Sequence, residues 1–257
     1  MPRLHLFEFH DFHWCPKTIR DGLTDFLETS IDAQDTYGPV RNKILEVLSR
    51  SGATRFVDLC SGGGGPWIHW LRKGEIESTA ILTDKFPNHQ ARDRLSRLGL
   101  PGLSYCSQPV DVTAVPSDLT GFRTLFTSFH HFRPEQAKRV LRDAVANRQP
   151  IGIFEFTSRT PKAMLLMLFS PLAVWLLTAR TRPIGLMRWL FTYPLPVIPL
   201  VVTIDGVISC LRTYSVRELK TLADATSVEA AEYTWLAGKE KGGLFPITYL
   251  IGYPGQM

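Results

Sequence analysis

A short apolar strand followed by a run of glycines constrains the fold of this chain more than any other feature. Residues 55–60 (Arg-Phe-Val-Asp-Leu-Cys) predict a buried strand, and Ser61 and four glycines, 62–65, follow it directly. Glycines let the backbone turn tightly and approach a ligand closely, and Pro66 suits the first turn of a helix. A strand, a tight turn and a helix in this order predict a crevice at the carboxyl end of a parallel sheet.

The rest of the chain alternates predicted strands with predicted helices. Residues 1–50 carry two helical patterns and no strand, which predicts a helical N-terminal cap. The later alternation predicts right-handed crossovers and an α/β fold: a doubly wound, seven-stranded, mostly parallel sheet covered on both faces. The last two strands are joined without a helix and predict an antiparallel hairpin at the sheet edge. Besides 55–60, strands are predicted at 79–86, 103–112, 122–129, 151–157, 229–235 and 246–253, and helices at 88–98, from Pro134, and from a capping box of Ser215 and Glu218.

The glycine turn does not fit the two commonest phosphate-binding motifs. A dinucleotide fingerprint requires Gly or Ala three places after its second glycine, and this chain has Trp67 or Ile68 there, depending on which glycines are counted. A P-loop requires Gly-Lys followed by Ser or Thr, which is absent from the turn. The sequence therefore predicts a different nucleotide-type ligand.

The turn resembles the first motif of class I S-adenosylmethionine-dependent methyltransferases, an acid followed by a G-x-G-x-G loop. Asp58 matches the acid, Gly62 and Gly64 match two of the glycines, and Cys60 stands where the first glycine usually is. The resemblance covers most of the chain, including the final hairpin. It implies a Rossmann-like methyltransferase domain with S-adenosyl-L-methionine as its cofactor.

The resemblance also implies which residues hold the cofactor. Asp84, after the second strand, would accept both ribose hydroxyls, and Asp111, at the end of the third, would accept the adenine amino group with Val112 against the ring. Asp58 would hold the loop amides or the cationic methionine end. For each acid the alternative is a solvated turn carboxylate, most of all for Asp111. The full predicted set is Asp58, Cys60, Ser61, Gly62, Gly64, Asp84, Lys85, Asp111, Val112 and Phe129.

Two adjacent histidines follow the predicted fourth strand, where the resemblance places residues that face the acceptor. His130 or His131 is a candidate catalytic base, since a histidine near neutral pKa can remove a proton from the acceptor. The alternative is that they cap the next helix or line the pocket. No metal site is predicted, because the acids and histidines of residues 8–13 alternate with phenylalanines without ligand spacing.

Residues 161–205 interrupt the alternation with a strongly apolar, Pro-rich insertion. The stretch 163–177 would make a helix of roughly 22 Å, short of a hydrocarbon core of about 30 Å, and Pro171 would kink it. Three interpretations are open: a lid or membrane-docking hairpin, a structural or dimer contact, and a transmembrane hairpin. The predicted organisation is a cap over 1–50, a methyltransferase domain over 51–160 and 206–257, and the insertion between.

Composition limits the partners and the compartment. The net charge of +5 is modest and its arginines are scattered, so we expect no nucleic acid partner. Four widely spaced cysteines and no signal peptide favour a cytoplasmic protein, with peripheral membrane association through 163–202. The oligomeric state stays open.

We therefore expect methyl transfer to an oxygen, nitrogen or carbon nucleophile of a small hydrophobic acceptor or lipid. A polar acceptor would hardly need a wall as apolar as the insertion. Two alternatives remain: a nicotinamide-dependent reductase, and a non-catalytic, membrane-associated nucleotide-binding protein of the same fold.

Overall fold

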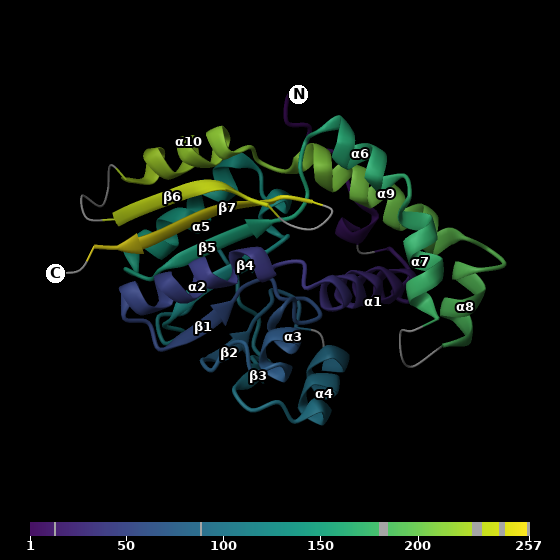
Figure 1. Ribbon diagram of the computed structural model, residues 1–257, viewed down its shortest axis with the longest axis horizontal. Coiled ribbons are helices and arrows are strands. Elements are labelled where there is room, and N and C mark those ends of the chain that lie inside the picture. The colour runs from purple at the N-terminus through teal and green to yellow at the C-terminus, as the bar shows by residue number, and fades with distance from the viewer. Residues whose placement is uncertain (13, 88, 180–184, 228–232, 242–244, 256–257) are drawn as a thin grey trace.

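A seven-stranded sheet forms the centre of the computed structural model, which describes all residues except 13, 88, 180–184, 228–232, 242–244 and 256–257 (Figure 1). The strand order is β3-β2-β1-β4-β5-β7-β6. Neighbouring strands from β3 to β5 are parallel, and β7 is antiparallel to both β5 and β6. The predicted doubly wound, mostly parallel sheet with a terminal hairpin is confirmed.

The strands lie where the sequence predicts them, but several have different ends. The prediction for the third strand (103–112) is wrong beyond Tyr105, because Pro109 has no N–H to donate to a strand neighbour. The fourth ends at Phe126 rather than 129, and the sixth continues to Glu240, through a glycine predicted to lie in the connection. Residues 229–232 of the predicted sixth strand lie outside the described residues. The strands are β1 Arg55–Asp58, β2 Thr79–Leu82, β3 Leu103–Tyr105, β4 Phe122–Phe126, β5 Ile151–Glu155, β6 Tyr233–Glu240 and β7 Ile247–Pro254.

Helices cover both faces of the sheet and enclose two apolar cores. On one face, α5 (Pro134–Ala146) and α10 (Val216–Ser227) pack side by side, with α10 over β6 and β7, through a core that includes Val140 and Leu219. On the other, α2 (Gly38–Ser51), α3 (Trp67–Arg72) and α4 (His89–Leu98) pack through a core that includes Ile44 and Trp70. Residue 88, the predicted start of α4, lies outside the described residues. The predicted capping box forms at α10, where the Ser215 amide donates to Glu218 and the Glu218 amide donates back to the Ser215 hydroxyl.

The insertion folds into a helical arm that extends from one side of the sheet (Figure 1). Its helices are α6 (Pro161–Met167), α7 (Ser170–Thr178), α8 (Leu186–Thr192) and α9 (Val197–Arg212). The last of these continues seven residues beyond the predicted end of the insertion at 205. The arm packs on α1 (Lys17–Gln34) through a small core of its own, made of Leu23, Val174, Ile198, Val201 and Val202.

No helix in the described part of the arm is both long and apolar enough to cross a membrane alone. In two places, two consecutive helices would together be long and apolar enough, but each of these pairs is bent. The bend is 41° between α6 and α7, at the break just before Pro171, and 68° between α8 and α9. The kink expected near Pro171 is confirmed.

Candidate functional site

The glycine turn leaves β1 at the carboxyl edge of the sheet and adopts backbone conformations that few side chains tolerate. Gly62 has φ +52° and Gly64 φ +115°. Cys60, at the place of the first glycine in the motif, has φ +58°, a left-handed conformation that costs a residue with a side chain roughly 1–2 kcal/mol. A Cβ added at Gly62 would meet no atom within 4 Å, so this part of the turn leaves room for a ligand.

Asp58 lies beneath the turn and is almost fully buried. One carboxylate oxygen accepts a hydrogen bond of 2.6 Å from the Thr124 hydroxyl of β4. Burial raises the pKa of Asp58 to about 6, although the Thr124 hydrogen bond opposes this. The Ser61 and Thr83 hydroxyls both donate to the backbone carbonyl of Asp58, which fixes the strand end against the turn.

Asp84 follows β2 and reaches across to the same turn. One of its oxygens accepts the Gly62 amide at 3.2 Å, and the other accepts the Phe86 amide at 2.9 Å. Each carboxylate oxygen has a second lone pair, so the group can still accept two hydroxyl groups of a ligand. Burial raises the pKa of Asp84, and the backbone hydrogen bonds from Phe86 and Gly62 lower it.

Asp111 does not end a strand, contrary to the prediction, but lies in the loop six residues beyond β3. The loop is held at the sheet edge because the Val110 amide donates to the Asp84 carbonyl oxygen. The Asp111 carboxylate accepts from the Lys85 ammonium at 2.8 Å and from Thr113, and these hydrogen bonds lower its pKa to about 2.

A hollow of about 300 Å³ opens between the turn and this loop. Four predicted cofactor residues line it, and four further residues complete the wall. The lining is Cys60, Lys85, Asp111, Val112, Thr113, Phe132, Gln136 and Arg139. The structure therefore brings Cys60, Lys85, Asp111 and Val112 together at one crevice, with Gly62 and Asp84 joined by a hydrogen bond in the adjoining turn.

The segment after β4 carries the remaining predicted residues. Phe129, His130 and His131 form a short 3₁₀ helix rather than the end of a strand. Phe129 is fully buried in the core beneath α5, and its ring packs at a tilt against that of Tyr214. His130 is also buried, and its Nδ1 lies 2.7 Å from a carboxylate oxygen of Glu155, the last residue of β5.

Solved structures of low sequence identity share this architecture. One is the pyocyanin biosynthetic protein PhzM, with a TM-score of 0.50 and 15% identity over 83% of this chain and 54% of that one. The methyltransferase domain of bacterial CtHen1 also has a TM-score of 0.50, with 13% identity over 84% and 97%. The plantazolicin methyltransferase BpumL in complex with SAH has a TM-score of 0.51, with 9% identity over 91% and 85%. The chain has the class I methyltransferase fold.

Sequence comparison does not narrow this assignment, since no family model and no curated protein matches the chain. The chain spans about half the length of PhzM. The class I methyltransferase fold nevertheless accounts for the order of the sheet and for the crevice at its carboxyl edge.

Sequence reasoning missed four residues that surround the histidines of this class I methyltransferase fold. Glu8 and Asp11, from the N-terminal segment, and Arg212, from the end of α9, converge on His131 and its neighbour. Glu155 completes the group from β5. Glu8 and Asp11 are three residues apart, but more than 110 residues separate them from the histidines, so no local spacing signals the cluster.

Proposed function

We propose that the chain is an S-adenosylmethionine-dependent methyltransferase. The observation that carries this proposal is the contact between Asp84 and Gly62 beside the hollow. It puts a carboxylate with spare acceptor capacity next to an open backbone turn, an arrangement suited to a ribose and the chain attached to it. Lys85, Asp111 and Val112 then line the space on the side where the adenine would lie.

The remaining predicted residues have supporting roles in this proposal. Asp58, Ser61 and Gly64 hold the shape of the turn, and Phe129 supports the following segment from the core. When bound, the cofactor supplies an electrophilic methyl group: the acceptor nucleophile bonds to the methyl carbon as the carbon–sulfur bond breaks and its electron pair stays on sulfur. Of the two predicted bases, the partly exposed His131 would contact the acceptor and control its proton, and the buried His130 would support it.

Binding of S-adenosylhomocysteine tests the cofactor assignment. Calorimetry should detect its binding to the wild type, and Asp84→Ala should weaken the affinity at least tenfold because two ribose hydroxyls lose a charged acceptor. Asp93→Ala, which removes an exposed carboxylate from α4, is the matched control and should bind like the wild type. Thermal melts of both variants show whether each chain still folds.

Two results would reject the assignment. One is affinity like that of the wild type in Asp84→Ala. The other is a wild type that binds NADH in this crevice but not S-adenosylhomocysteine, which would favour the nicotinamide-dependent alternative. A chain that binds the cofactor but methylates no member of a panel of lipophilic phenols, quinones and amines would instead favour a non-catalytic role.

We also propose that the arm docks on an anionic membrane surface and that the acceptor is a hydrophobic small molecule or lipid. Large apolar side chains are exposed on all four arm helices, an unusual density for a protein surface. The net charge of +5 complements an anionic surface, and Trp175 and Trp189 suit a membrane interface. The exposed large apolar residues of the arm, on its helices and the turns between them, are Leu165, Leu168, Phe169, Leu172, Trp175, Leu176, Leu186, Met187, Trp189, Leu195, Leu200 and Ile204.

A further inference from the structure

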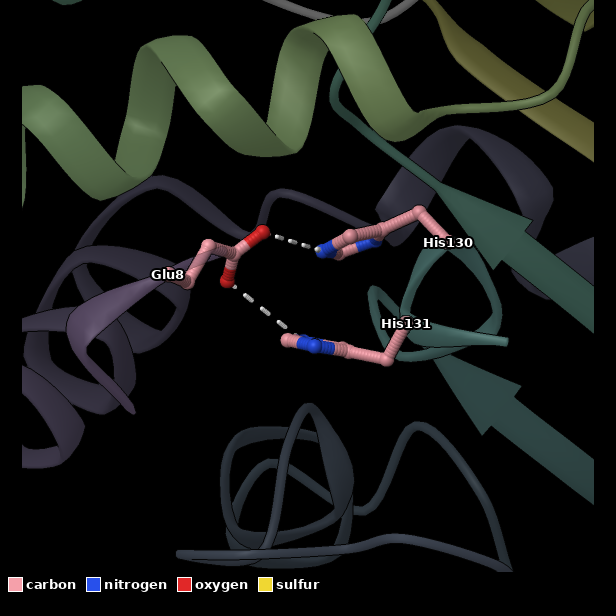
Figure 2. Close-up of side chains that lie close together, drawn as sticks. All are labelled: Glu8, His130 and His131. Atoms are coloured by element: carbon pink, nitrogen blue, oxygen red, sulfur yellow. Dashed lines mark ion pairs between the residues drawn. The ribbon is translucent and has the colours of Figure 1, made fainter. Parts of the chain in front are cut away.

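We infer that Glu8, His130 and His131 bind a divalent transition-metal ion. The three side chains converge from the N-terminal segment and from the turn after β4, and both imidazole rings face the Glu8 carboxylate (Figure 2). One ligand atom from each residue lies within 4.8 Å of the other two. This inference goes beyond the proposed methyl transfer, and metal binding can be measured whether or not the chain transfers a methyl group.

The orientation of both rings is set by carboxylates on their far sides. His130 Nδ1 lies 2.7 Å from Glu155 Oε2, and His131 Nδ1 lies 3.2 Å from Asp11 Oδ1. A hydrogen bond from Nδ1–H to a carboxylate leaves the Nε2 lone pair free. Histidines that ligate metals usually have such a partner, which fixes the ring and increases its basicity. In this chain each ring has one, and each Nε2 is directed at Glu8.

The gap between the rings and Glu8 is too wide for hydrogen bonds. His130 Nε2 lies 3.7 Å from Glu8 Oε1, and His131 Nε2 lies 3.8 Å from Glu8 Oε2. A proton shared between imidazole and carboxylate would bring the heavy atoms to about 2.7–2.9 Å. Ligand atoms about 2.0–2.2 Å from a common ion lie roughly 3.3–3.6 Å apart in tetrahedral geometry, and farther apart when the angle at the ion is wider. The observed gap therefore suits a metal ion better than a proton.

His130 Nε2 provides an independent observation. The residue is 2% exposed, and this nitrogen has no hydrogen-bond partner among the described residues. A buried polar atom without a partner is costly, and here it is directed at a carboxylate whose oxygens repel a lone pair. A cation between the two would remove both penalties.

The local charge also favours a cation. Three carboxylates, Glu8, Asp11 and Glu155, contact the two rings, and the guanidinium of Arg212 pairs with the first two of them. With neutral imidazoles, these residues carry a net charge of −2, which a divalent ion would neutralise. Arg212 and the Ser209 hydroxyl both contact Glu8 Oε1 and leave Oε2 as the oxygen better placed to bind the ion.

The donor set indicates the class of ion. Two imidazole nitrogens and one carboxylate suit Zn²⁺, Fe²⁺ or a similar ion rather than Mg²⁺ or Ca²⁺, which prefer oxygen ligands. Three protein ligands leave a position for a further oxygen atom, and the half-exposed His131 gives access to it. If the proposed methyl transfer holds, an acceptor hydroxyl bound there would become more acidic and release its proton to solvent. The histidines would then be ligands rather than bases.

A second cluster shares several of these features: His69 Nε2 is also without a hydrogen-bond partner among the described residues and lies 3.8 Å from Asp35 Oδ1. Asp35, His69 and Glu75 also lie close together, but they include a single imidazole. Arg41 pairs with both carboxylates of this cluster, at 3.2 Å and 2.6 Å. Arg212 compensates Glu8 and Asp11 in the same way, so the second imidazole is what distinguishes the first cluster, and His69 provides a matched control.

The experiment is a zinc titration of the full chain after chelator treatment. We expect calorimetry to give one Zn²⁺ per chain, and Glu8→Gln and His131→Ala each to weaken the affinity at least tenfold. Glu155→Gln should weaken it about 10- to 100-fold, because it removes the partner that orients His130. His69→Gln should bind zinc like the wild type. Circular dichroism melts without metal identify variants that fail to fold, and the half-exposed His131 makes His131→Ala the most tolerant of them.

Three outcomes would overturn the inference: no zinc binding by the folded wild type, unchanged affinity in Glu8→Gln and His131→Ala, or loss of binding only in His69→Gln. S-adenosylhomocysteine binding is measured on the same preparations. A chain that binds this ligand but not zinc would reject the metal site and leave the methyltransferase assignment intact, and the reverse result would do the opposite.

Discussion

Asp58 shows at the scale of a single residue how a ligand crevice can oppose folding. Its carboxyl group is buried beneath the glycine turn, and its pKa is raised to about 6. The unfolded chain releases this proton near the ordinary value of 3.8, whereas the folded chain keeps it to higher pH. The contribution to stability is therefore fully present below about pH 4 and is lost as pH rises to about 6.

Asp58→Asn should remove this pH dependence, because the amide has a similar shape and does not titrate. A shift of about two pKa units corresponds to on the order of 3 kcal/mol. We expect the free energy of unfolding of the wild type, relative to that of Asp58→Asn, to fall by about this amount between pH 4 and pH 7. Urea titrations at four pH values measure it. Parallel pH profiles for the two proteins would show that Asp58 titrates normally.

The sequence predicts residues near the glycine turn better than those near the histidines, for a physical reason. The residues from Asp58 to Gly64 act within one local turn, whose geometry is encoded by consecutive residues. Glu8 reaches His131 only because the N-terminal segment packs against α9. There the backbone amide of the next residue, Phe9, donates a hydrogen bond to the Asp205 carboxylate. That tertiary contact has no periodic signal, so the sequence shows the phenylalanines around Glu8 but not its partners.

At the scale of elements, a buried ion pair fixes α5 on the sheet. The Arg123 guanidinium of β4 is almost fully buried and lies 2.6 Å from the Asp143 carboxylate of α5. Desolvation lowers the pKa of Arg123, and Asp143 opposes that shift. Removing one partner of such a pair leaves an uncompensated buried charge, whereas removing both does not.

Asp143→Leu alone should therefore destabilise the chain by about 3–5 kcal/mol. Arg123→Met combined with Asp143→Leu should recover most of that loss, because apolar groups of similar size then fill the space between β4 and α5. A double-mutant cycle tests this. It compares the free energies of unfolding in urea of the wild type, the two single variants and the double variant. A double variant as unstable as the sum of the two single variants would show that the charges act independently.

The sequence predicts the type and order of the helices and strands well, and their exact ends less well. Apolar patterning identifies β1, β4 and α5, because α5 buries one face in a single core and the two strands bury alternate side chains in the cores on both faces of the sheet. Strand ends depend instead on whether a neighbour offers a hydrogen-bond partner. After β3, Pro109 has no N–H to donate, and the next N–H, that of Val110, bonds to the carbonyl of Asp84 in a loop. A pattern of side chains contains no such information.

At the scale of the whole molecule, α1 joins the crevice to the arm. Arg94 of α4 donates to the Gly63 carbonyl of the glycine turn and pairs with Asp25 and Glu28 of α1. Arg188 of α8 pairs with the same Asp25. Burial raises the pKa of Glu28 to about 7, so part of this network titrates near neutrality. A ligand in the crevice and a surface beneath the arm would thus act on one set of charges.

Membrane docking through the arm is tested by vesicle flotation. The wild type should float with vesicles of mixed phosphatidylcholine and phosphatidylglycerol. Leu172→Glu combined with Leu176→Glu should lower the partition coefficient onto the vesicles by at least about a hundredfold, since burying each leucine contributes about 1.5–3 kcal/mol. Both side chains are more than half exposed, so these changes leave the core of the arm intact. Leu236→Glu on β6 places the same charge at another exposed leucine and should float like the wild type.

The same variants also show whether the exposed apolar face of the arm binds a membrane or a second copy of the chain. Docking on lipid predicts that flotation is lost in the double variant while sedimentation in the absence of vesicles is unchanged. A dimer contact predicts no flotation of the wild type and a dimer that the two glutamates dissociate, because each would place a charge in an apolar interface. That second pattern would reject the membrane proposal, and so would equal flotation of the double variant and Leu236→Glu.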